Sequence, residues 1–256
     1  MAENRSAALD AAADGLSPTS DLTDEIFGIV DALRDNLPLR RALTDTSLEP
    51  DARGRLVERL FGHRIGSAAA SLLTAAVAMD WPSGLGLADA LEVQGVRIGV
   101  RSGSPETVRA ELGACARLIG GNAELEQSLS AHGSAAEDRS ALVTGLLGPR
   151  VGAATLVLVQ HAARRGGRVD RTIAGYEEIA SSVLGRRLAR VTVARALPED
   201  QAERLRTQLT RIYAAPIDLS IGIDPGVVGG VRVLIGDEVI DGTIAAALDQ
   251  ARREFV

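Results

Sequence analysis

Gly62-His63-Arg64-Ile65-Gly66 returns 86 residues later as Gly148-Pro149-Arg150-Val151-Gly152, so the motif Gly-x-Arg-x-Gly occurs twice at a fixed distance. When the sequence is shifted by that distance, residues 21–95 align with 107–181 without a gap, and 16 of these 75 positions are identical. Helical patterning alone gives scattered Leu and Ala matches, whereas matched Gly and Arg in one short run indicate a duplicated structural unit. Other identical pairs are Glu25/Glu111, Asn36/Asn122, Arg53/Arg139 and Glu92/Glu178.

The duplicated unit has the apolar spacing of helices. From about residue 22 to 182, apolar residues recur three or four positions apart, as in Ile26, Val30 and Leu33. Pro50 and Pro105 stand where first turns are expected, and glycines interrupt the pattern often. We therefore predict two helical bundles with short connections, one in residues 1–100 and one in 101–184.

One helix in each copy is rich in Ala, at residues 67–78 and 153–164. Small side chains let neighbouring helices approach closely, so each segment is expected to be a central packing helix. A second interpretation stays open, in which the segment forms one wall of a groove that accepts a helix of a partner.

The pattern changes after residue 184. Alternating apolar residues predict strands at 187–194 and 217–223, separated by a helix that begins near Pro198 and ends near Tyr213. A third strand is expected at 229–235, a tight turn at Gly236-Asp237, a short return strand, and a final helix capped by Asp241 or Thr243. The predicted fold class is α plus α+β: a duplicated N-terminal helical bundle followed by a small C-terminal α+β domain, residues 185–256.

Composition excludes several classes of function. The net charge is −6 and the isoelectric point is near 5.2, which argues against a nucleic-acid partner. The start of the chain lacks the pattern of a secretory signal, and the most apolar stretch, 151–159, is about half as long as a membrane-spanning helix. Cys115 cannot form an internal disulfide because it is the single Cys, and it is expected to be a buried apolar side chain.

No catalytic, metal or cofactor site is predicted. His63, His132 and His161 have no Cys, Asp or Glu at ligand spacing, and a chain without Lys cannot form a Gly-Lys phosphate loop. The run 226–230 precedes a strand rather than a helix, so we expect its glycines to shape a hairpin instead of binding a dinucleotide. Asp224, Asp237 and Asp241 lie beside Gly or Pro and are expected in turns and caps.

The C-terminal residues resemble one known family. Ile217-Asp218-Leu219, Ile223-Asp224, residues 227–233 and residues 235–244 are similar to the δ subunit of F-type ATP synthase, whose mitochondrial counterpart is the oligomycin-sensitivity-conferring protein. Ala194-Arg195-Ala196-Leu197 and Tyr176-Glu177-Glu178-Ile179 match further parts of the pattern. The usual member has one bundle, so the repeat accounts for the extra length, as in the long actinobacterial form.

The resemblance implies a non-catalytic subunit of the peripheral stalk, or stator, in ATP synthesis coupled to hydrogen ion transport. Such a subunit binds N-terminal helices of the α subunits through its bundle and the C-terminus of a b-type stalk subunit through its last domain. It is a peripheral protein at the cytoplasmic face of the cell membrane and reaches the membrane only through partners. The alternative, from another class, is a regulatory protein whose α+β module senses a small molecule.

The resemblance also implies candidate site residues. In the family the bound helix lies between the first and fifth bundle helices, which correspond here to residues 5–13 and 67–78, with 153–164 as an alternative fifth helix. Which copy binds the head stays open. The candidate groove residues are Ala8, Ala12, Leu72 and Ala76. The docking-domain motif consists of Ile223, Asp224, Val228, Gly229, Gly230, Gly236, Asp237, Asp241, Gly242 and Thr243.

Overall fold

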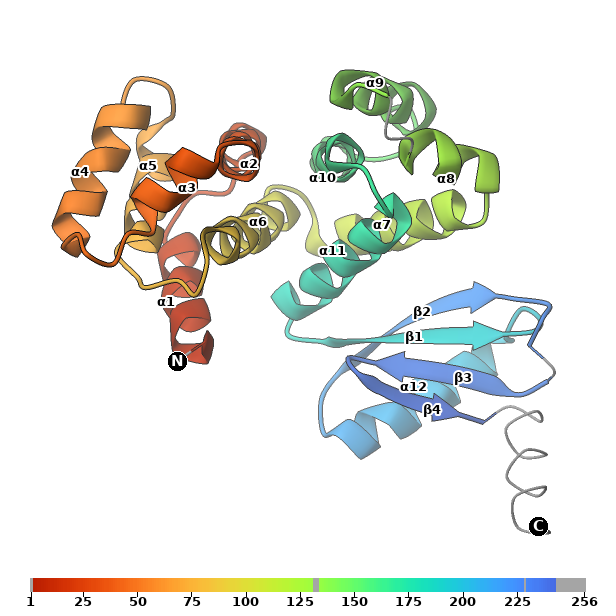
Figure 1. Ribbon diagram of the computed structural model, residues 1–256. Helices are drawn as coiled ribbons and strands as arrows, with labels where there is room; N and C mark the ends of the chain where they lie inside the picture. The colour runs from red at the N-terminus through yellow and green to blue at the C-terminus, as the bar shows by residue number, and fades with distance from the viewer. Residues whose placement is uncertain (1, 131–133, 228, 243–256) are drawn as a thin grey trace, which may run out of the picture. The chain divides into compact units, whose positions relative to one another are not determined.

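A computed structural model describes residues 2–130, 134–227 and 229–242 of the chain (Figure 1). Two motif residues, Val228 and Thr243, and the predicted final helix lie outside the described residues. The chain divides into two compact units, residues 1–179 and 180–256. Each unit is built around its own apolar core.

The first unit is helical throughout its described part. The bounds of its helices are α1 Ala2–Asp14, α2 Ser20–Asp35, α3 Leu37–Leu43, α4 Pro50–Phe61, α5 Ser67–Val77, α6 Gly84–Arg101, α7 Pro105–Gly120, α8 Ala123–Ser130, α9 Ala136–Leu147, α10 Ala153–Arg165 and α11 Val169–Val183. The boundary between the units falls within α11.

The helices repeat with the distance found in the sequence. A shift of 86 residues carries α4 onto α9 at both ends, and it carries α2, α3, α5 and α6 onto α7, α8, α10 and α11 with small differences at their termini. The predicted duplicated bundle is therefore confirmed as a repeat of five helices.

Identical residues of the two copies make identical contacts. The carboxylate of Glu25 on α2 accepts a hydrogen bond from the backbone N–H of Gly66, at 3.0 Å, just before α5 begins. Glu111 on α7 accepts the equivalent bond from Gly152, at 3.1 Å, just before α10. A helix N-terminus has unpaired N–H groups and a partial positive charge, so a carboxylate there stabilises it. The Gly-x-Arg-x-Gly turn thus ends in a helix cap provided by a distant side chain.

The opposite ends of α5 and α10 are capped by a second repeated pair. The guanidinium of Arg53, which is 2% exposed, donates to the carbonyl oxygens of Ala78 and Met79 and contacts Asp80. Arg139 donates in the same way to the carbonyls of Ala163 and Arg164. The last carbonyls of a helix have no partner within it, so these arginines supply the missing donors. Both Ala-rich helices are therefore held at each end by side chains from other helices of their copy.

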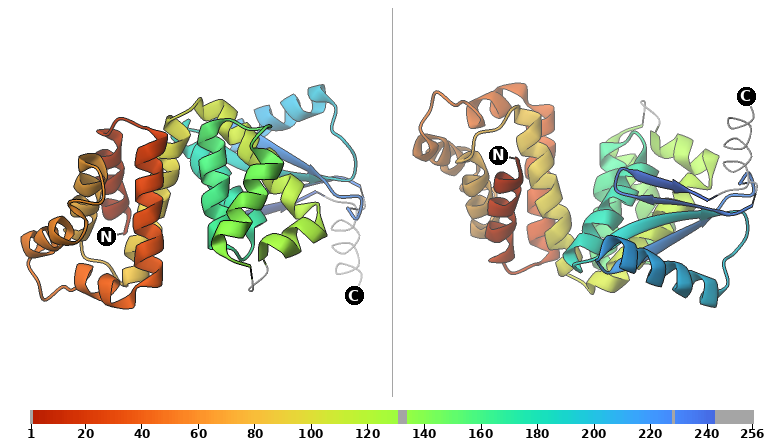
Figure 2. Two further views of the ribbon diagram at one scale, coloured as in Figure 1. Left: turned by 90° about the horizontal axis from the view of Figure 1, so that it is seen from above. Right: turned by 90° about the horizontal axis from the view of Figure 1, so that it is seen from below.

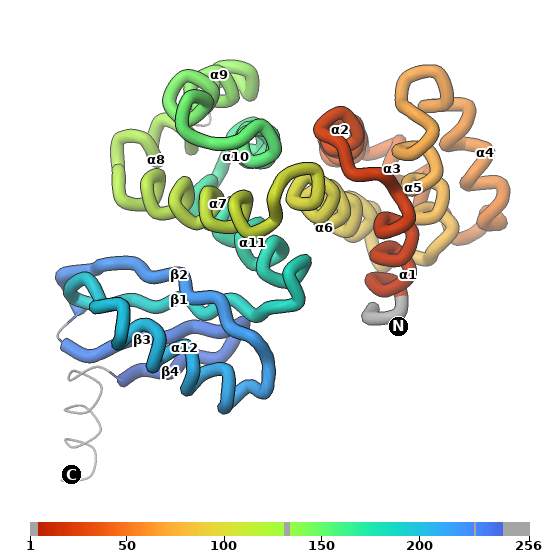
Figure 3. Tube along the Cα trace, turned by 180° about the vertical axis from the view of Figure 1, so that it is seen from behind, coloured from red at the N-terminus to blue at the C-terminus, as the bar shows by residue number. Residues whose placement is uncertain are grey.

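Helix α6 belongs to both copies. The 86-residue shift places α1 on residues 88–100, inside α6, and α6 contacts α10 as α1 contacts α5. Figure 3 shows α6 beside α2, and this approach is close because α6 carries glycines on that side. A Cβ at Gly95 would lie 2.8 Å from the ring of Phe27, and one at Gly99 would lie 3.1 Å from Thr23. The C-terminal half of α6 thus takes the place of a first helix in the second copy.

The second unit contains a four-stranded sheet and one described helix (Figure 2). Its elements are β1 Arg187–Val193, α12 Glu199–Tyr213, β2 Ile217–Ile223, β3 Val231–Ile235 and β4 Glu238–Asp241. The strand order is β2-β1-β3-β4, with β1 and β2 parallel and the other pairs antiparallel. Helix α12 connects the parallel strands, as such a connection requires. Leu209 of α12 is buried with Ala189, Val191 and Val193 of β1, which confirms the predicted α+β module.

The expected hairpin at residues 226–230 is wrong. β2 and β3 are not neighbours, because β1 lies between them, so residues 224–230 cross from one side of β1 to the other. The alternating pattern identified each strand but could not give the pairing order. The tight turn at Gly236-Asp237 does join neighbouring strands, β3 and β4, and Gly236 has the positive φ of 58° that such a turn needs.

We expect Arg53→Ala to lower the free energy of unfolding of the first unit by about 2 kcal/mol, because it removes buried hydrogen bonds to carbonyls that then lack donors. Trp81 is the single Trp of the chain and donates to the carbonyl of Ala76 in the same unit, so its fluorescence reports the transition. Arg59→Ala, at an exposed position of α4, is the control and should change the free energy by less than about 0.5 kcal/mol. Equal effects of the two variants would contradict the capping role.

Candidate functional site

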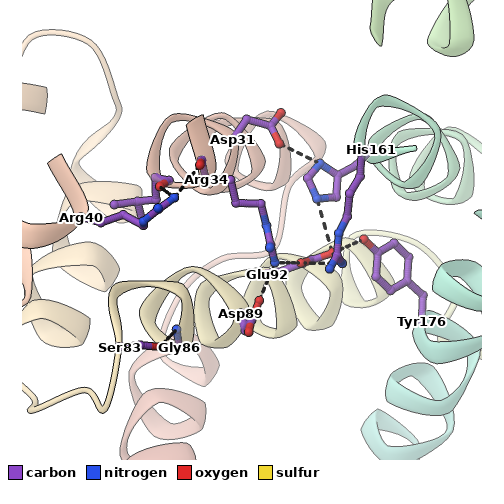
Figure 4. A network of polar contacts seen from close by, with 11 residues as sticks. Asp31, Arg34, Arg40, Ser83, Gly86, Asp89, Glu92, His161 and Tyr176 are labelled. Atoms are coloured by element: carbon purple, nitrogen blue, oxygen red, sulfur yellow. Dashed lines mark hydrogen bonds and ion pairs between the residues drawn. The ribbon is translucent and has the colours of Figure 1, made fainter. Parts of the chain in front are cut away.

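A buried carboxylate joins the two copies of the bundle. Glu92 of α6, with a side chain 7% exposed, accepts four hydrogen bonds from three residues on three other helices (Figure 4). Arg34 of α2 donates at 2.7 Å, Arg165 at the end of α10 at 2.8 Å, and the hydroxyl of Tyr176 on α11 at 2.6 Å. Arg34 also pairs with Asp89, one turn before Glu92. The donors come from both copies, so this cluster ties them together.

His161 of α10 extends the cluster toward α2. Its ring is fully buried and stacks on Phe27, with centroids 3.8 Å apart and planes 2° from parallel. Its Nδ1 lies 3.8 Å from Asp31 and its Nε2 lies 3.6 Å from Glu92, distances longer than a hydrogen bond. Arg164 follows His161 by three residues on α10, and its Nε lies 3.8 Å from the other carboxylate oxygen of Asp31. α2 is therefore fastened to α10 by one stacked ring pair and by opposite charges.

Burial and the cationic neighbours have opposite effects on the acids of this cluster. Burial by itself raises the pKa of Glu92, but contacts with His161, Tyr176 and Arg165 lower that pKa from 4.5 to about 2. Burial raises the pKa of Asp31, against the charges of His161 and Arg164. Burial, followed by the charge of Glu92, raises the pKa of Tyr176 well above 10, so this phenol remains a hydrogen-bond donor. Glu92 is thus an anion held by surrounding donors.

The cluster has the properties of a structural joint. Its one deeply buried carboxylate is saturated by donors, so it has no free lone pair positioned to accept a proton from a substrate. Within residues 2–130, 134–227 and 229–242, no group of three or more His, Cys, Asp or Glu side chains could hold a metal ion. A buried ion cluster whose charges are mutually paired is costly to break, because a remaining charge would stay buried without its partner. What this arrangement can do is fix α2, α6, α10 and α11 relative to one another.

The docking-domain motif shapes the connection after β2. The N–H of Asp224 donates to the carbonyl of Val193 at 2.9 Å, and the Asp224 carboxylate accepts from the N–H of Gly226 at 2.8 Å. Gly229 and Gly230 have φ angles of 67° and 77°, a region that side chains other than Gly adopt with strain. The motif glycines therefore serve backbone geometry. Ile223, at the end of β2, is 59% exposed and is the apolar side chain that this part of the motif presents.

The remaining motif residues lie around β4. Asp237 stands in the β3–β4 turn, and Gly242 donates its N–H to the carbonyl of Val231 at 2.9 Å. Asp241, expected as a possible cap of the final helix, is the last residue of β4, where its carboxylate pairs with Arg232 at 3.1 Å. Asp241 and Gly242 thus lie at the end of the sheet where the connection from Asp224 enters β3, whereas Asp237 lies at the opposite end of the β3–β4 hairpin.

Two of the four candidate groove residues are placed differently from the expectation. Ala8 on α1 is exposed and Ala12 is half-buried. Leu72 and Ala76 on α5 are fully buried in the core, so they cannot line an open groove, and this expectation is wrong. Leu72 and Ala76 are four residues apart and lie on the same inward face. The exposed residues beside them are Ser71, Thr74 and Ala78.

The joint around Glu92 was missed by the sequence analysis as a site. The sequence contains one indication, because Glu92 is identical to its repeat equivalent Glu178. That identity does not indicate a shared site, since Glu92 is buried and Glu178 is exposed. The other members of the cluster are not repeated, because the alignment pairs Arg34 with Gly120, Tyr176 with Ala90 and His161 with Ala75. The cluster is therefore absent from the repeat pattern. Cys115 is buried as predicted, and burial together with Glu111 raises the pKa of its thiol to about 11.

Comparisons with known proteins agree with the resemblance. The family model described as ATP synthase delta (OSCP) subunit matches residues 96–255, beginning inside α6. "ATP synthase subunit delta" of Nocardioides sp. is 40% identical over 238 residues, covering 91% of this chain and 86% of the relative. The protein of the same name from Cutibacterium acnes is 38% identical over 252 residues, covering 96% of each.

Among solved structures, a chain of the Toxoplasma gondii mitochondrial ATP synthase hexamer aligns with a TM-score of 0.39 and 11% identity. That alignment covers 64% of this chain and 94% of the other, and its TM-score is too low to bear on the fold. No helix in the described part of the chain has the length and apolarity that crossing a membrane requires.

We expect Glu92→Gln to lower the free energy of unfolding of the first unit by about 3 kcal/mol, because Arg34 and Arg165 then lose the buried charge that they share. Urea unfolding followed by Trp81 fluorescence measures the effect. The repeat offers a matched control, Glu178→Gln, at the equivalent but exposed position of α11, where about 0.5 kcal/mol is expected. A loss at Glu178 as large as that at Glu92 would contradict the joint.

The contribution of Glu92 should depend on pH. Its pKa is about 2 in the folded protein and about 4.5 when unfolded, so the stabilisation is complete above pH 4.5 and is lost as the pH falls toward 2. The difference in unfolding free energy between the natural protein and Glu92→Gln should therefore be constant from pH 7 to 5 and shrink below. Asp31 is present in both proteins, so its own contribution to the pH dependence largely cancels in this difference. A difference that stays unchanged down to pH 3 would show that the charge of Glu92 contributes nothing.

Proposed function

The chain belongs to the ATP synthase delta (OSCP) subunit family, and from that premise we propose that its helical unit binds the N-terminal helices of the α subunits while its α+β unit binds the C-terminus of a b-type stalk subunit. As a member of this family it is a non-catalytic subunit of the ATP synthase peripheral stalk. It links the catalytic head to the membrane-anchored part of the enzyme, so that proton-driven rotation is coupled to ATP synthesis.

The observation that supports this division of labour is the joint within the helical unit. A stator subunit must transmit torque without bending, and here the continuous helix α6 and the buried ion cluster at Glu92 lock the two bundle copies into one body. The α+β unit has its own core and can therefore present an independent surface. One rigid unit and one separate unit suit two different partners.

We assign the stalk contact to the motif of the α+β unit. The end of β2, the connection that follows it and the β3–β4 hairpin contain the described motif residues, and exposed apolar side chains occur at the end of β2 and in the hairpin. Ile223, just before the connection, is 59% exposed, and Val239 in the hairpin is 58% exposed. In this proposal Asp224, Gly229 and Gly230, with Gly236, Asp237, Asp241 and Gly242, set the backbone that presents them.

The cellular position follows from the partners in the same proposal. The protein is placed at the cytoplasmic face of the cell membrane as a peripheral component, held there by the b-type subunit. The alternative function, a regulatory small-molecule sensor, has no observation in its favour, because the family match includes the α+β unit that would be the sensor.

Truncation after Val183 tests the assignment of partners. We expect fragment 1–183 to keep the helical unit folded, with an unchanged Trp81 transition, and to keep its affinity for the catalytic head. Binding to the C-terminal half of the b-type subunit, measured by calorimetry, should be lost, because the fragment lacks the sheet and its motif.

The control is the full chain, measured in parallel, which shows that the b-subunit preparation is able to bind. Binding of the b-type subunit by fragment 1–183 with undiminished affinity would overturn the proposed division. Failure of the full chain to bind either partner would overturn the proposed function itself.

A further inference from the structure

A small pocket lies between α1 and α6 in the first copy. Its volume is about 150 Å³, and its apolar wall consists of Leu9, Trp81, Ala90 and Val93. Leu9 belongs to α1, Trp81 to the connection between α5 and α6, and the other two residues to α6. Apolar cavities of about this volume accept one benzene ring. The pocket therefore has room for a single aromatic ring that touches three segments of the chain.

The polar side of the pocket includes a buried acceptor that lacks a donor. Gln94 of α6 lines the pocket and is 2% exposed. Its Nε2 donates to the carboxylate of Asp10 on α1 at 2.8 Å. A carboxylate only accepts hydrogen bonds, so this contact sets the orientation of the amide. Oε1 of Gln94 is buried and has no hydrogen-bond partner among the described residues. An occupant that supplies an O–H or N–H donor would remove the cost of this unsatisfied oxygen.

The second copy holds a phenol at the equivalent place. The 86-residue shift carries α1 onto the C-terminal part of α6 and carries α6 onto α11, and it pairs Ala90 with Tyr176 and Ser6 with Glu92. Tyr176 is 4% exposed, and its hydroxyl donates to Glu92 at 2.6 Å (Figure 4). Ser6 and Ala90 both line the pocket of the first copy. That copy therefore has a methyl group and a cavity where the second copy has a hydrogen-bonded phenol.

We propose that this pocket binds one phenolic ring, with the ring against Leu9, Trp81 and Val93 and the hydroxyl donating to Oε1 of Gln94. The ligand takes the place that the side chain of Tyr176 fills in the second copy. The phenol belongs either to a small molecule or to the tyrosine side chain of a peptide, and both present the same chemical group. An occupant of this site fastens α1 to α6. The site is separate from the partner contacts proposed above and does not depend on them.

The charges around the pocket favour a neutral ligand. The guanidinium of Arg5 lies over the ring of Trp81, 5.6 Å from its centroid, and Arg97 lies 3.6 Å from Asp10. These two cations disfavour a positively charged ligand, whereas Asp10 and the acceptor oxygen of Gln94 disfavour an anion. A ring without a donor would leave that oxygen unsatisfied. A neutral phenol meets all three requirements, because it is uncharged, apolar in its ring and able to donate.

Binding of p-cresol to the full chain tests the class of ligand. Trp81 is the single Trp and lines the pocket, so its fluorescence, excited where phenols do not absorb, reports occupancy. We expect a Kd on the order of 1 mM, because a ligand of so few atoms gains little binding free energy. Toluene has nearly the same shape without the hydroxyl and should bind about fivefold more weakly or worse. Equal affinities of the two ligands, or no binding of p-cresol, would overturn the proposal.

Three variants locate the bound ring. Ala90→Tyr gives the first copy the side chain that the second copy carries, so binding of p-cresol should be lost while the Trp81 unfolding transition shows that the chain is folded. Ala110→Tyr, at an exposed position of α7, is the control and should change the Kd by less than about twofold. Gln94→Leu removes the acceptor, so p-cresol should bind no better than toluene. Binding of p-cresol that Ala90→Tyr leaves unchanged would place the ligand elsewhere and contradict the proposal.

A second pair of ligands separates the two sources of the phenol. Binding of N-acetyl-tyrosinamide with an affinity close to that of p-cresol would assign the pocket to a tyrosine side chain of a peptide. Binding of p-cresol without N-acetyl-tyrosinamide would assign it to a small phenolic molecule. A preference for N-acetyl-phenylalaninamide over N-acetyl-tyrosinamide would contradict the role of Gln94. None of these measurements involves the catalytic head or the b-type subunit, so failure of this proposal would leave the proposed function intact.

Discussion

The arrangement of the helical unit depends on one buried negative charge. Glu92 lies inside the protein, where an unpaired carboxylate would be prohibitively costly, and its stability there requires donors from α2, α10 and α11 at the same time. A cluster of this kind has little tolerance for displacement, because each helix that moved away would leave a charge or a hydroxyl unsatisfied. The two bundle copies are thereby specified in one mutual position, which apolar packing alone would define less sharply.

Outside that joint, some residues are identical in the two copies and others differ. The devices that stabilise each copy alone were kept: the carboxylates of Glu25 and Glu111 at helix starts and the guanidiniums of Arg53 and Arg139 at helix ends. The changed positions lie on the outer faces of α5 and α10. There the second copy has larger side chains and is covered by α2, whereas the equivalent residues of the first copy are small. The repeat thus separates folding residues from residues free to specialise.

Much of this fold follows from sequence patterns that are local or periodic. The helices, the strands and the 86-residue repeat all depend on residues near one another in the chain or on a fixed spacing, so they were predicted. The crossing of residues 224–230 over β1 was not, because alternation identifies a strand without identifying its neighbour. The buried state of Leu72 and Ala76 depended on the rotation of α5, which an Ala-rich helix with apolar residues on most sides leaves undefined. The joint connects Glu92 to donors up to 84 positions away and has no counterpart in the repeat.

The sharing of α6 has a consequence for how such a chain can change its length. Because this helix ends one copy and begins the next, each residue inserted in it would turn the second copy by about 100° and displace it by about 1.5 Å relative to the first. A single insertion after Glu92 would therefore swing α10 and α11 away from α2 and separate Glu92 from Arg165 and Tyr176, two of its three donors. Loops between the other helices can absorb added residues without such rotation. The length of α6 therefore sets the rotation of the second copy relative to the first. Only one rotation brings Arg165 and Tyr176 to Glu92.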